Sequence, residues 1–246
     1  MRSWLEALMR EAGELALSFH KGKFEVFKKA DGSPVTSADL AVHDLFVSSI
    51  SQRYPEDCIV SEEGYVDESR RQAARRAWII DPIDGTSLFI AGRDCFGILV
   101  GLWEEGRIVA SAASFPAKQI EMYSARGEGC FLNGKRVFVS DRAENPLISC
   151  WGEEYATLNT VSEAMEIPSL AMVQVAAGQL DGCMSRVAGT WGEHDVAFAC
   201  CAIEEAGGTI TDETGNALTL NLPERKRPTT MIWSNGRVHR SLMQWA

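Results

Sequence analysis

Residues 78–86 bring together side chains that could bind a metal ion. An apolar stretch ends directly in Asp81, a proline forces a turn, and a second carboxylate follows at Asp84. Hard divalent cations prefer oxygen ligands, and the main-chain carbonyl of Ile83 adds a third oxygen to these two carboxylates. The segment therefore predicts a divalent-cation site at the end of a strand.

The next two residues, Gly85 and Thr86, can begin a helix. Free backbone amides at a helix start bind phosphate oxygens, so the same segment could hold both a metal and an anion. The alternative is that Asp84 only caps a helix and Asp81 only forms a turn, as in most Asp-Pro-x-Asp-Gly strings.

Other acidic residues occupy comparable positions. Glu62 and Glu63 follow a predicted strand, and Asp195, preceded by His194, opens a predicted helix. Asp39 lies in the first turn of another predicted helix. Taken singly, the glutamates fit a solvated turn, Asp195 fits an ordinary N-cap, and Asp39 fits an acid that interacts with the helix dipole.

The elements that must position these residues follow from hydrophobic periodicity. Apolar residues at helical spacing predict helices over 4–19, 37–52, 169–180, 195–206 and 236–246. Short apolar runs predict strands over 58–60, 77–80, 96–103, 108–110, 121–123, 136–139, 147–150, 209–211 and 231–233, with a hairpin at 104–107. These elements indicate two α/β layers.

The pattern changes after Asn145-Pro146, which divides the chain into residues 1–145 and 146–246. The first part is predicted to be α+β and to carry most metal ligands, and the second to be α/β and to carry Asp195 and the substrate-specificity elements. No long linker separates the parts, so we expect them to pack together with the site in a cleft between them.

Composition restricts the function. The 246 residues contain 24 Lys and Arg against 34 Asp and Glu, a net charge of −10. This charge disfavours a nucleic-acid partner, and it would repel an anionic substrate unless cations mediate the contact.

The apolar runs are much shorter than the roughly 20 residues that cross a bilayer. With charges interrupting the first residues, we expect a cytoplasmic protein without a membrane partner. The seven cysteines include no Cys-x-x-Cys pair, so we expect reduced core thiols.

Several positions together carry a resemblance to a known family. They are Glu62-Glu63, Asp81-Pro82-Ile83-Asp84-Gly85-Thr86 and Asp195, with an early loop from Asp31 to Asp39, a turn at Asn133-Gly134-Lys135, and the segment Glu204–Gly208. The chain resembles the inositol monophosphatase family of metal-dependent phosphatases over nearly its whole length. The resemblance implies an α/β (α+β) fold, a five-layered αβαβα sandwich of the inositol-monophosphatase and fructose-bisphosphatase type.

The resemblance also implies roles for individual residues. Two or three Mg²⁺ ions would be held by Glu62, Asp81, the Ile83 carbonyl, Asp84 and Asp195, with Asp39 in the outer or third-metal shell. Metal-activated water would then attack a phosphate monoester, with Glu62 as general base, Thr86 as relay and Asp81 as a further catalytic carboxylate. The Gly85 and Thr86 amides would hold the phosphate beside Asp84 and Asp195.

The chain departs from the family where substrate is recognised. The late aspartate usually follows an aromatic residue, whereas here His194 precedes Asp195 and Trp191 lies upstream. His194 is either a partner of Asp195 or a substrate contact. Asp181-Gly182 is not followed by the glutamate of inositol-phosphate enzymes, and Arg186, if it faces the cleft, favours a substrate with a second anionic group.

The substrate therefore stays open. Residues 87–92 and 96–99 resemble histidinol-phosphatases, and Ser61 before Glu62 resembles 3'(2'),5'-bisphosphate nucleotidases. Fructose-1,6-bisphosphatase activity is a third alternative, and a phosphate-ligand-binding relative with weak or no turnover is the non-enzymatic one. The resemblance adds a homodimer and sensitivity to lithium.

Overall fold

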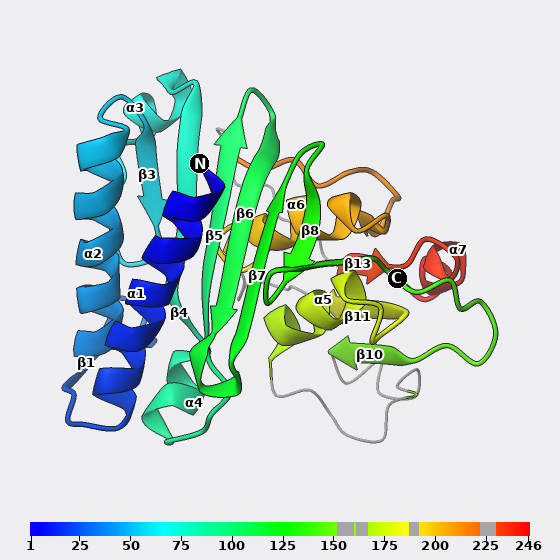
Figure 1. Ribbon diagram of the computed structural model, residues 1–246, viewed down its shortest axis with the longest axis horizontal. Helices are drawn as coiled ribbons and strands as arrows, with labels where there is room; N and C mark the ends of the chain where they lie inside the picture. The colour runs from blue at the N-terminus through cyan, green and yellow to red at the C-terminus, as the bar shows by residue number, and fades with distance from the viewer. Residues whose placement is uncertain (152–159, 161–166, 187–191, 222–229) are drawn as a thin grey trace.

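A seven-stranded sheet forms the larger layer of the computed structural model, which describes residues 1–151, 160, 167–186, 192–221 and 230–246 (Figure 1). Its strands, in spatial as well as sequence order, are β3 (Cys58–Ser61), β4 (Arg76–Asp84), β5 (Gly97–Glu104), β6 (Arg107–Phe115), β7 (Ile120–Ala125), β8 (Gly129–Leu132) and β9 (Lys135–Val137). Only the β3–β4 pair is parallel, and the other neighbours are antiparallel. The first connection therefore differs from the hairpins that follow it.

Two long helices cover one face of this sheet (Figure 1). Helix α1 (Arg2–His20) buries the apolar face that its periodicity predicts, including Leu5 and Leu8. Helix α2 (Ser37–Arg53) begins with a capping box in which Thr36 and Asp39 bond to each other's backbone amides. A short hairpin, β1 (Val26–Lys28) and β2 (Pro34–Thr36), connects the two helices.

Helices α5 (Pro168–Ala176) and α6 (Ala197–Glu205) occupy the layer between the two sheets. They are apolar on nearly all sides, and one core cluster joins them to Leu99 of the first sheet and Trp233 of the second. Because a helix with no polar face must be covered on both sides, this composition requires a sheet on each side.

The second sheet has four strands, in the order β10 (Ile148–Trp151), β11 (Gly182–Arg186), β13 (Thr230–Ser234) and β12 (Thr209–Asp212). The short helix α7 (His239–Leu242) packs on its outer face against Ile148, Met184 and Ile232. The layers are thus α, β, α, β and α, which confirms the sandwich that the resemblance implied.

Some boundaries differ from the sequence-based expectations. Helix α6 begins at Ala197, so Asp195 lies in the turn before the helix rather than opening it. The expected helices over 169–180 and 236–246 are shorter, as α5 and α7. Strands β1, β2, β8 and β11 and helix α3 (Glu68–Ala73) were not expected, since each is short and lacks a clear apolar alternation.

All seven cysteines are buried and none forms a disulfide. Within the described parts of the chain, no helix has the length and apolar character needed to span a bilayer.

Candidate active site

The parallel pairing of β3 and β4 brings the first two acidic segments to one edge of the sheet. Ser61 pairs with Ile80, and the Glu62 amide donates a hydrogen bond to the Ile80 carbonyl at 3.0 Å. Glu62 and Asp81 therefore leave neighbouring strand ends side by side. Strand β4 continues through a register shift to Asp84, beyond the end at residue 80 that its apolar run predicted.

Four carboxylates and one imidazole converge at this edge. One group contains Glu62, Asp81 and His194, and a second contains Asp81, Asp84 and Asp195. Within each group, one potential ligand atom per residue lies within 4.8 Å of the others. The two groups share Asp81, so the arrangement can hold two adjacent cations with one carboxylate between them.

Burial and the mutual repulsion of the carboxylates act on Asp81 and Asp84. Burial raises the pKa of Asp81 well above its ordinary value, and the charges of Glu62, Asp84 and Asp195 raise it further. Burial and the charge of Asp195 also raise the pKa of Asp84 to about 7, although Ser169 donates a hydrogen bond to its carboxylate. Oδ1 of Asp81 is buried and has no hydrogen-bond partner among the described residues.

These features fit a divalent cation. The donor set consists mainly of carboxylate oxygens, the ligands that hard cations prefer. A bound cation would supply the partner that Asp81 Oδ1 lacks and would offset the repulsion among the carboxylates.

Asp39 holds Thr86 from the other side of the site. Asp39 is fully buried, and its Oδ2 accepts hydrogen bonds from the Thr36 amide at 2.8 Å and the Thr36 hydroxyl at 2.5 Å. The Thr86 hydroxyl lies 3.2 Å from Asp39 Oδ1 and 3.0 Å from the Ile83 carbonyl. Asp39 belongs to neither acidic group, and its visible effect is to orient Thr86.

Gly85 allows the turn into helix α4 (Thr86–Ile90). Its φ of +81° lies in the left-handed region, and a Cβ at this position would lie 3.3 Å from the Cys95 carbonyl oxygen. A side chain would therefore be strained here. The glycine leaves the amides of residues 85 and 86 at the start of the helix, as expected from the sequence.

Lys29, in the β1–β2 connection, is a site residue that sequence reasoning missed. Its Nζ lies 2.6 Å from Glu62 Oε1 and 2.6 Å from Glu63 Oε1. Burial lowers the pKa of Lys29, but its bonds to the two glutamates outweigh that effect and raise it. Burial raises the pKa of Glu63 to about 7 despite the bond from Lys29. A lysine two residues before Asp31-Gly32 offered no periodic signal, because its partners lie more than thirty residues away.

The turn that carries His194 and Asp195 is attached to the first half of the chain by Arg71. This arginine of helix α3 is 1% exposed, and its guanidinium lies 3.3 Å from Glu193 Oε2 and 3.2 Å from Glu68 Oε1. The other oxygen of Glu193 accepts a hydrogen bond from the Asn221 amide. The sequence offered no signal for this link, which joins two segments far apart in the chain. Trp191 lies outside the described residues.

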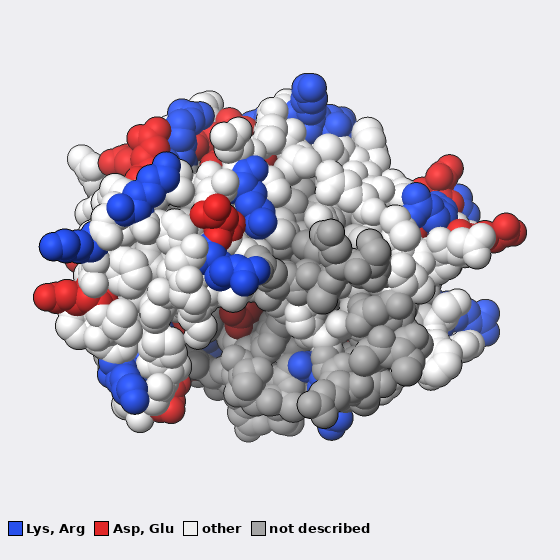
Figure 2. All heavy atoms as spheres, turned by 90° about the horizontal axis from the view of Figure 1, so that it is seen from below, with Lys and Arg blue, Asp and Glu red and all other residues white. Residues whose placement is uncertain are grey.

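Arg186 ends strand β11 and is exposed. On the face seen in Figure 2, basic and acidic side chains lie intermixed, so the net negative charge is not gathered into one patch there.

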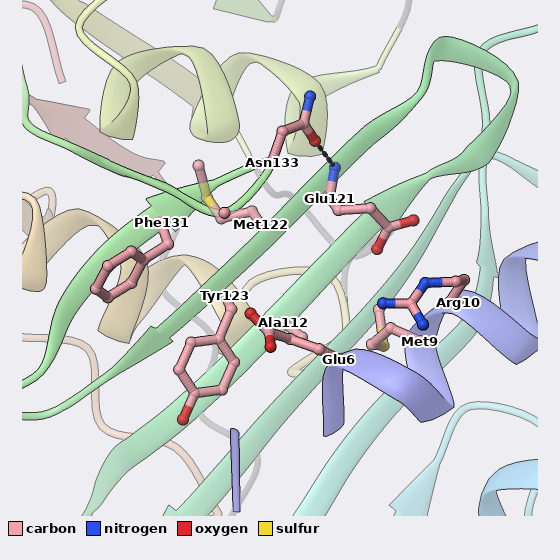
Figure 3. Close-up of a pocket in the computed structure, with 10 residues that line it drawn as sticks. Glu6, Met9, Arg10, Ala112, Glu121, Met122, Tyr123, Phe131 and Asn133 are labelled. Carbon is pink, nitrogen blue, oxygen red and sulfur yellow. Dashed lines mark hydrogen bonds between the residues drawn. The ribbon is translucent and has the colours of Figure 1, made fainter. Parts of the chain in front are cut away.

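A separate cavity of about 310 Å³ lies between α1 and the sheet (Figure 3). Glu6 and Arg10 face it from the helix, and Glu121 and Tyr123 face it from β7. Glu6 pairs with Arg2 at 3.0 Å, and Glu121 accepts a hydrogen bond from Ser114 at 2.6 Å. Its acids therefore already have protein partners, unlike Asp81.

Comparisons with known proteins identify similar sequences and structures. The model of the inositol monophosphatase family matches residues 1–241. A histidinol-phosphatase of Chlorobaculum parvum is 34% identical over 85% of this chain and 84% of its own length. A fructose-1,6-bisphosphatase/inositol-1-monophosphatase of Thermotoga maritima is 30% identical over 94% and 90%. Among solved structures, an IMPase of Thermotoga maritima has a TM-score of 0.84 at 26% identity, covering 99% of this chain and 95% of that one.

Proposed function

The chain belongs to the inositol monophosphatase family and is a phosphatase, and from this premise we propose that it is a Mg²⁺-dependent phosphomonoesterase acting on a small phosphorylated metabolite. The observation that carries the proposal is the pair of acidic groups that share Asp81, whose Oδ1 is buried without a hydrogen-bond partner among the described residues.

The residues that would hold the metal are Glu62, Asp81, the Ile83 carbonyl, Asp84 and Asp195, for two ions, with Asp39 near a third. Bound Mg²⁺ supplies Lewis-acid chemistry, lowering the pKa of water and neutralising charge on the phosphate. The cations also make an acidic site attractive to an anionic substrate.

The protein groups then orient the reactants. Glu62 accepts the proton from the attacking water, and its bond to Lys29 fixes the position of the carboxylate. Thr86, held by Asp39 and the Ile83 carbonyl, orients the same water. The amides of Gly85 and Thr86 bind phosphate oxygens at the start of α4, as the resemblance implied. Asp81, Asp84 and Asp195 surround the transferred group.

The two parts of the chain share the work in this proposal. Residues 1–145 carry most of the acids, and residues 146–246 carry Asp195, His194 and Arg186. We place Arg186 on the substrate side, where it would meet a second anionic group. A cytoplasmic homodimer inhibited by lithium completes the proposal, as the resemblance implied.

The substrate is tested with a panel of inositol 1-phosphate, histidinol phosphate, adenosine 3',5'-bisphosphate and fructose 1,6-bisphosphate. Histidinol phosphate is the second candidate, because the 34% identical relative is a histidinol-phosphatase. Phosphate release is measured with and without Mg²⁺. Lithium is added to the active reactions to test inhibition. Light scattering gives the mass of the protein in solution, which tests the homodimer. Turnover of one ester only when Mg²⁺ is present supports the proposal. Binding without turnover across the panel would instead identify a phosphate-ligand-binding relative.

A further inference from the structure

We propose that His194 is a metal ligand, and that its imidazole makes the position it shares with Glu62 and Asp81 prefer Co²⁺ or Zn²⁺ to Mg²⁺. The inference rests on the proposed function, because it concerns a cation bound at the same site. The position formed by Asp81, Asp84 and Asp195 offers carboxylates alone and keeps the preference for a hard cation.

The separation between His194 and Glu62 fits two atoms that share an ion. Nε2 of His194 lies 4.0 Å from Glu62 Oε2, beyond the range of a hydrogen bond. Ligand atoms about 2.1 Å from one ion lie about 3.4 Å apart at tetrahedral angles and about 4.2 Å apart on opposite sides of the ion. The observed separation falls within this interval. Nε2 also lies 3.7 Å from Asp195 Oδ2, an ion-pair distance within the same turn.

Gly192 leaves room for the imidazole. A Cβ on Gly192 would overlap Cε1 and Nδ1 of His194 and would lie 2.6 Å from its Nε2, so the ring lies directly against the glycine backbone. A side chain at residue 192 would therefore displace the ring. The Gly192 amide also donates a hydrogen bond to Asp195, which joins the ring and the carboxylate in one turn.

The turn is held from outside the site as well. Glu193 lies between the glycine and the histidine, and its carboxylate is bound by Arg71 and by the Asn221 amide. His194 is about one quarter exposed, so an ion can reach it from solvent. The turn is thus held in place, and the imidazole is accessible.

The chemistry of the ligand then determines the preference. Imidazole nitrogen suits Zn²⁺ and other first-row transition ions, whereas Mg²⁺ prefers oxygen ligands. One nitrogen among carboxylates therefore favours Co²⁺ and Zn²⁺ at this position more than Mg²⁺.

The test compares wild type with His194→Gln, and with His20→Gln as the control. His20 packs against the rings of Phe89 and Phe96 and belongs to neither acidic group. Calorimetric titrations give the dissociation constants of Co²⁺ and Mg²⁺ for each protein. The ratio of the two constants is compared, because partial unfolding of a variant affects both ions equally. Proton NMR of the Co²⁺ protein reports directly on the ligand through a paramagnetically shifted imidazole N–H resonance.

We expect the preference for Co²⁺ over Mg²⁺ to fall about 10–100-fold in His194→Gln, the range seen when residues that support metal ligands are changed. The shifted resonance should be present in wild type and His20→Gln and absent in His194→Gln. Gly192→Ala, which displaces the ring without removing it, should also lower the preference.

An unchanged ratio together with a retained resonance in His194→Gln would overturn the inference. So would a fall in kcat/KM with the ratio unchanged, which would identify His194 as a substrate contact instead. A wild-type protein that binds neither ion would overturn the proposed function as well, so the two failures are distinguishable.

Discussion

Replacing Asp84 by asparagine separates the contribution of this carboxylate to catalysis from its effect on stability. Loss of supporting residues around a metal ligand costs about 10–100-fold in affinity or activity. Loss of a ligand carboxylate should cost more, so we expect phosphate release by Asp84→Asn to fall by at least about 100-fold at saturating Mg²⁺. The side chain keeps its volume and can still accept the hydrogen bond from Ser169, so the fold should persist.

The same substitution should stabilise the metal-free protein. Asp84 has a pKa of about 7 in the folded state and an ordinary value of 3.8. Between these values the folded state holds a proton that the unfolded state has released, so this carboxyl group makes the wild type less stable as the pH rises. At about 1.4 kcal/mol per pH unit, the full effect is of the order of 4 kcal/mol. The asparagine, which does not titrate, removes this loss.

The assay is urea unfolding with a chelator at pH 4 and pH 8, for wild type, Asp84→Asn and Asp141→Asn. Asp141 is exposed and serves as the matched control. We expect Asp84→Asn to gain stability relative to wild type at pH 8 but not at pH 4, and Mg²⁺ to reverse the order. A variant that gains no more at pH 8 than at pH 4, or that releases phosphate at the wild-type rate, would refute the reasoning.

Other substitutions test the residues that hold the site together. Arg71→Met leaves the Glu193 carboxylate without its buried partner. In chemical denaturation, this variant should lower the free energy of unfolding by about 3–5 kcal/mol. Arg70 is exposed, so the control Arg70→Met should change the free energy of unfolding little. Thr86→Val removes the hydroxyl between Asp39 and the Ile83 carbonyl. Steady-state kinetics should show a fall in kcat that is larger than the change in KM, and Thr86→Ser, which keeps the hydroxyl, should retain activity. Lys29→Met removes the cation that fixes the position of the Glu62 carboxylate, so calorimetry should show weaker Mg²⁺ binding. Tighter binding would mean that the lysine competes with the metal for the glutamate.

The local parts of the site could be predicted from sequence because short-range rules govern them. An apolar run followed by Asp81, a proline and Asp84 specifies a strand that ends in two acids, and Gly85 is required by the left-handed turn into α4. The periodicity of α1 and α2 predicted both helices. In each case the interacting residues are only a few positions apart.

Only the tertiary structure decided which distant groups meet. Parallel pairing of β3 and β4 sets Glu62 beside Asp81, and packing of α6 between two sheets brings Asp195 to the same edge. The contacts of Lys29 and Arg71 likewise join segments remote in sequence. Burial of apolar faces determines these positions, and it does so for the whole chain at once. The types of the acids were therefore readable from the sequence, whereas their distances, partners and raised pKa values depend on how the layers pack.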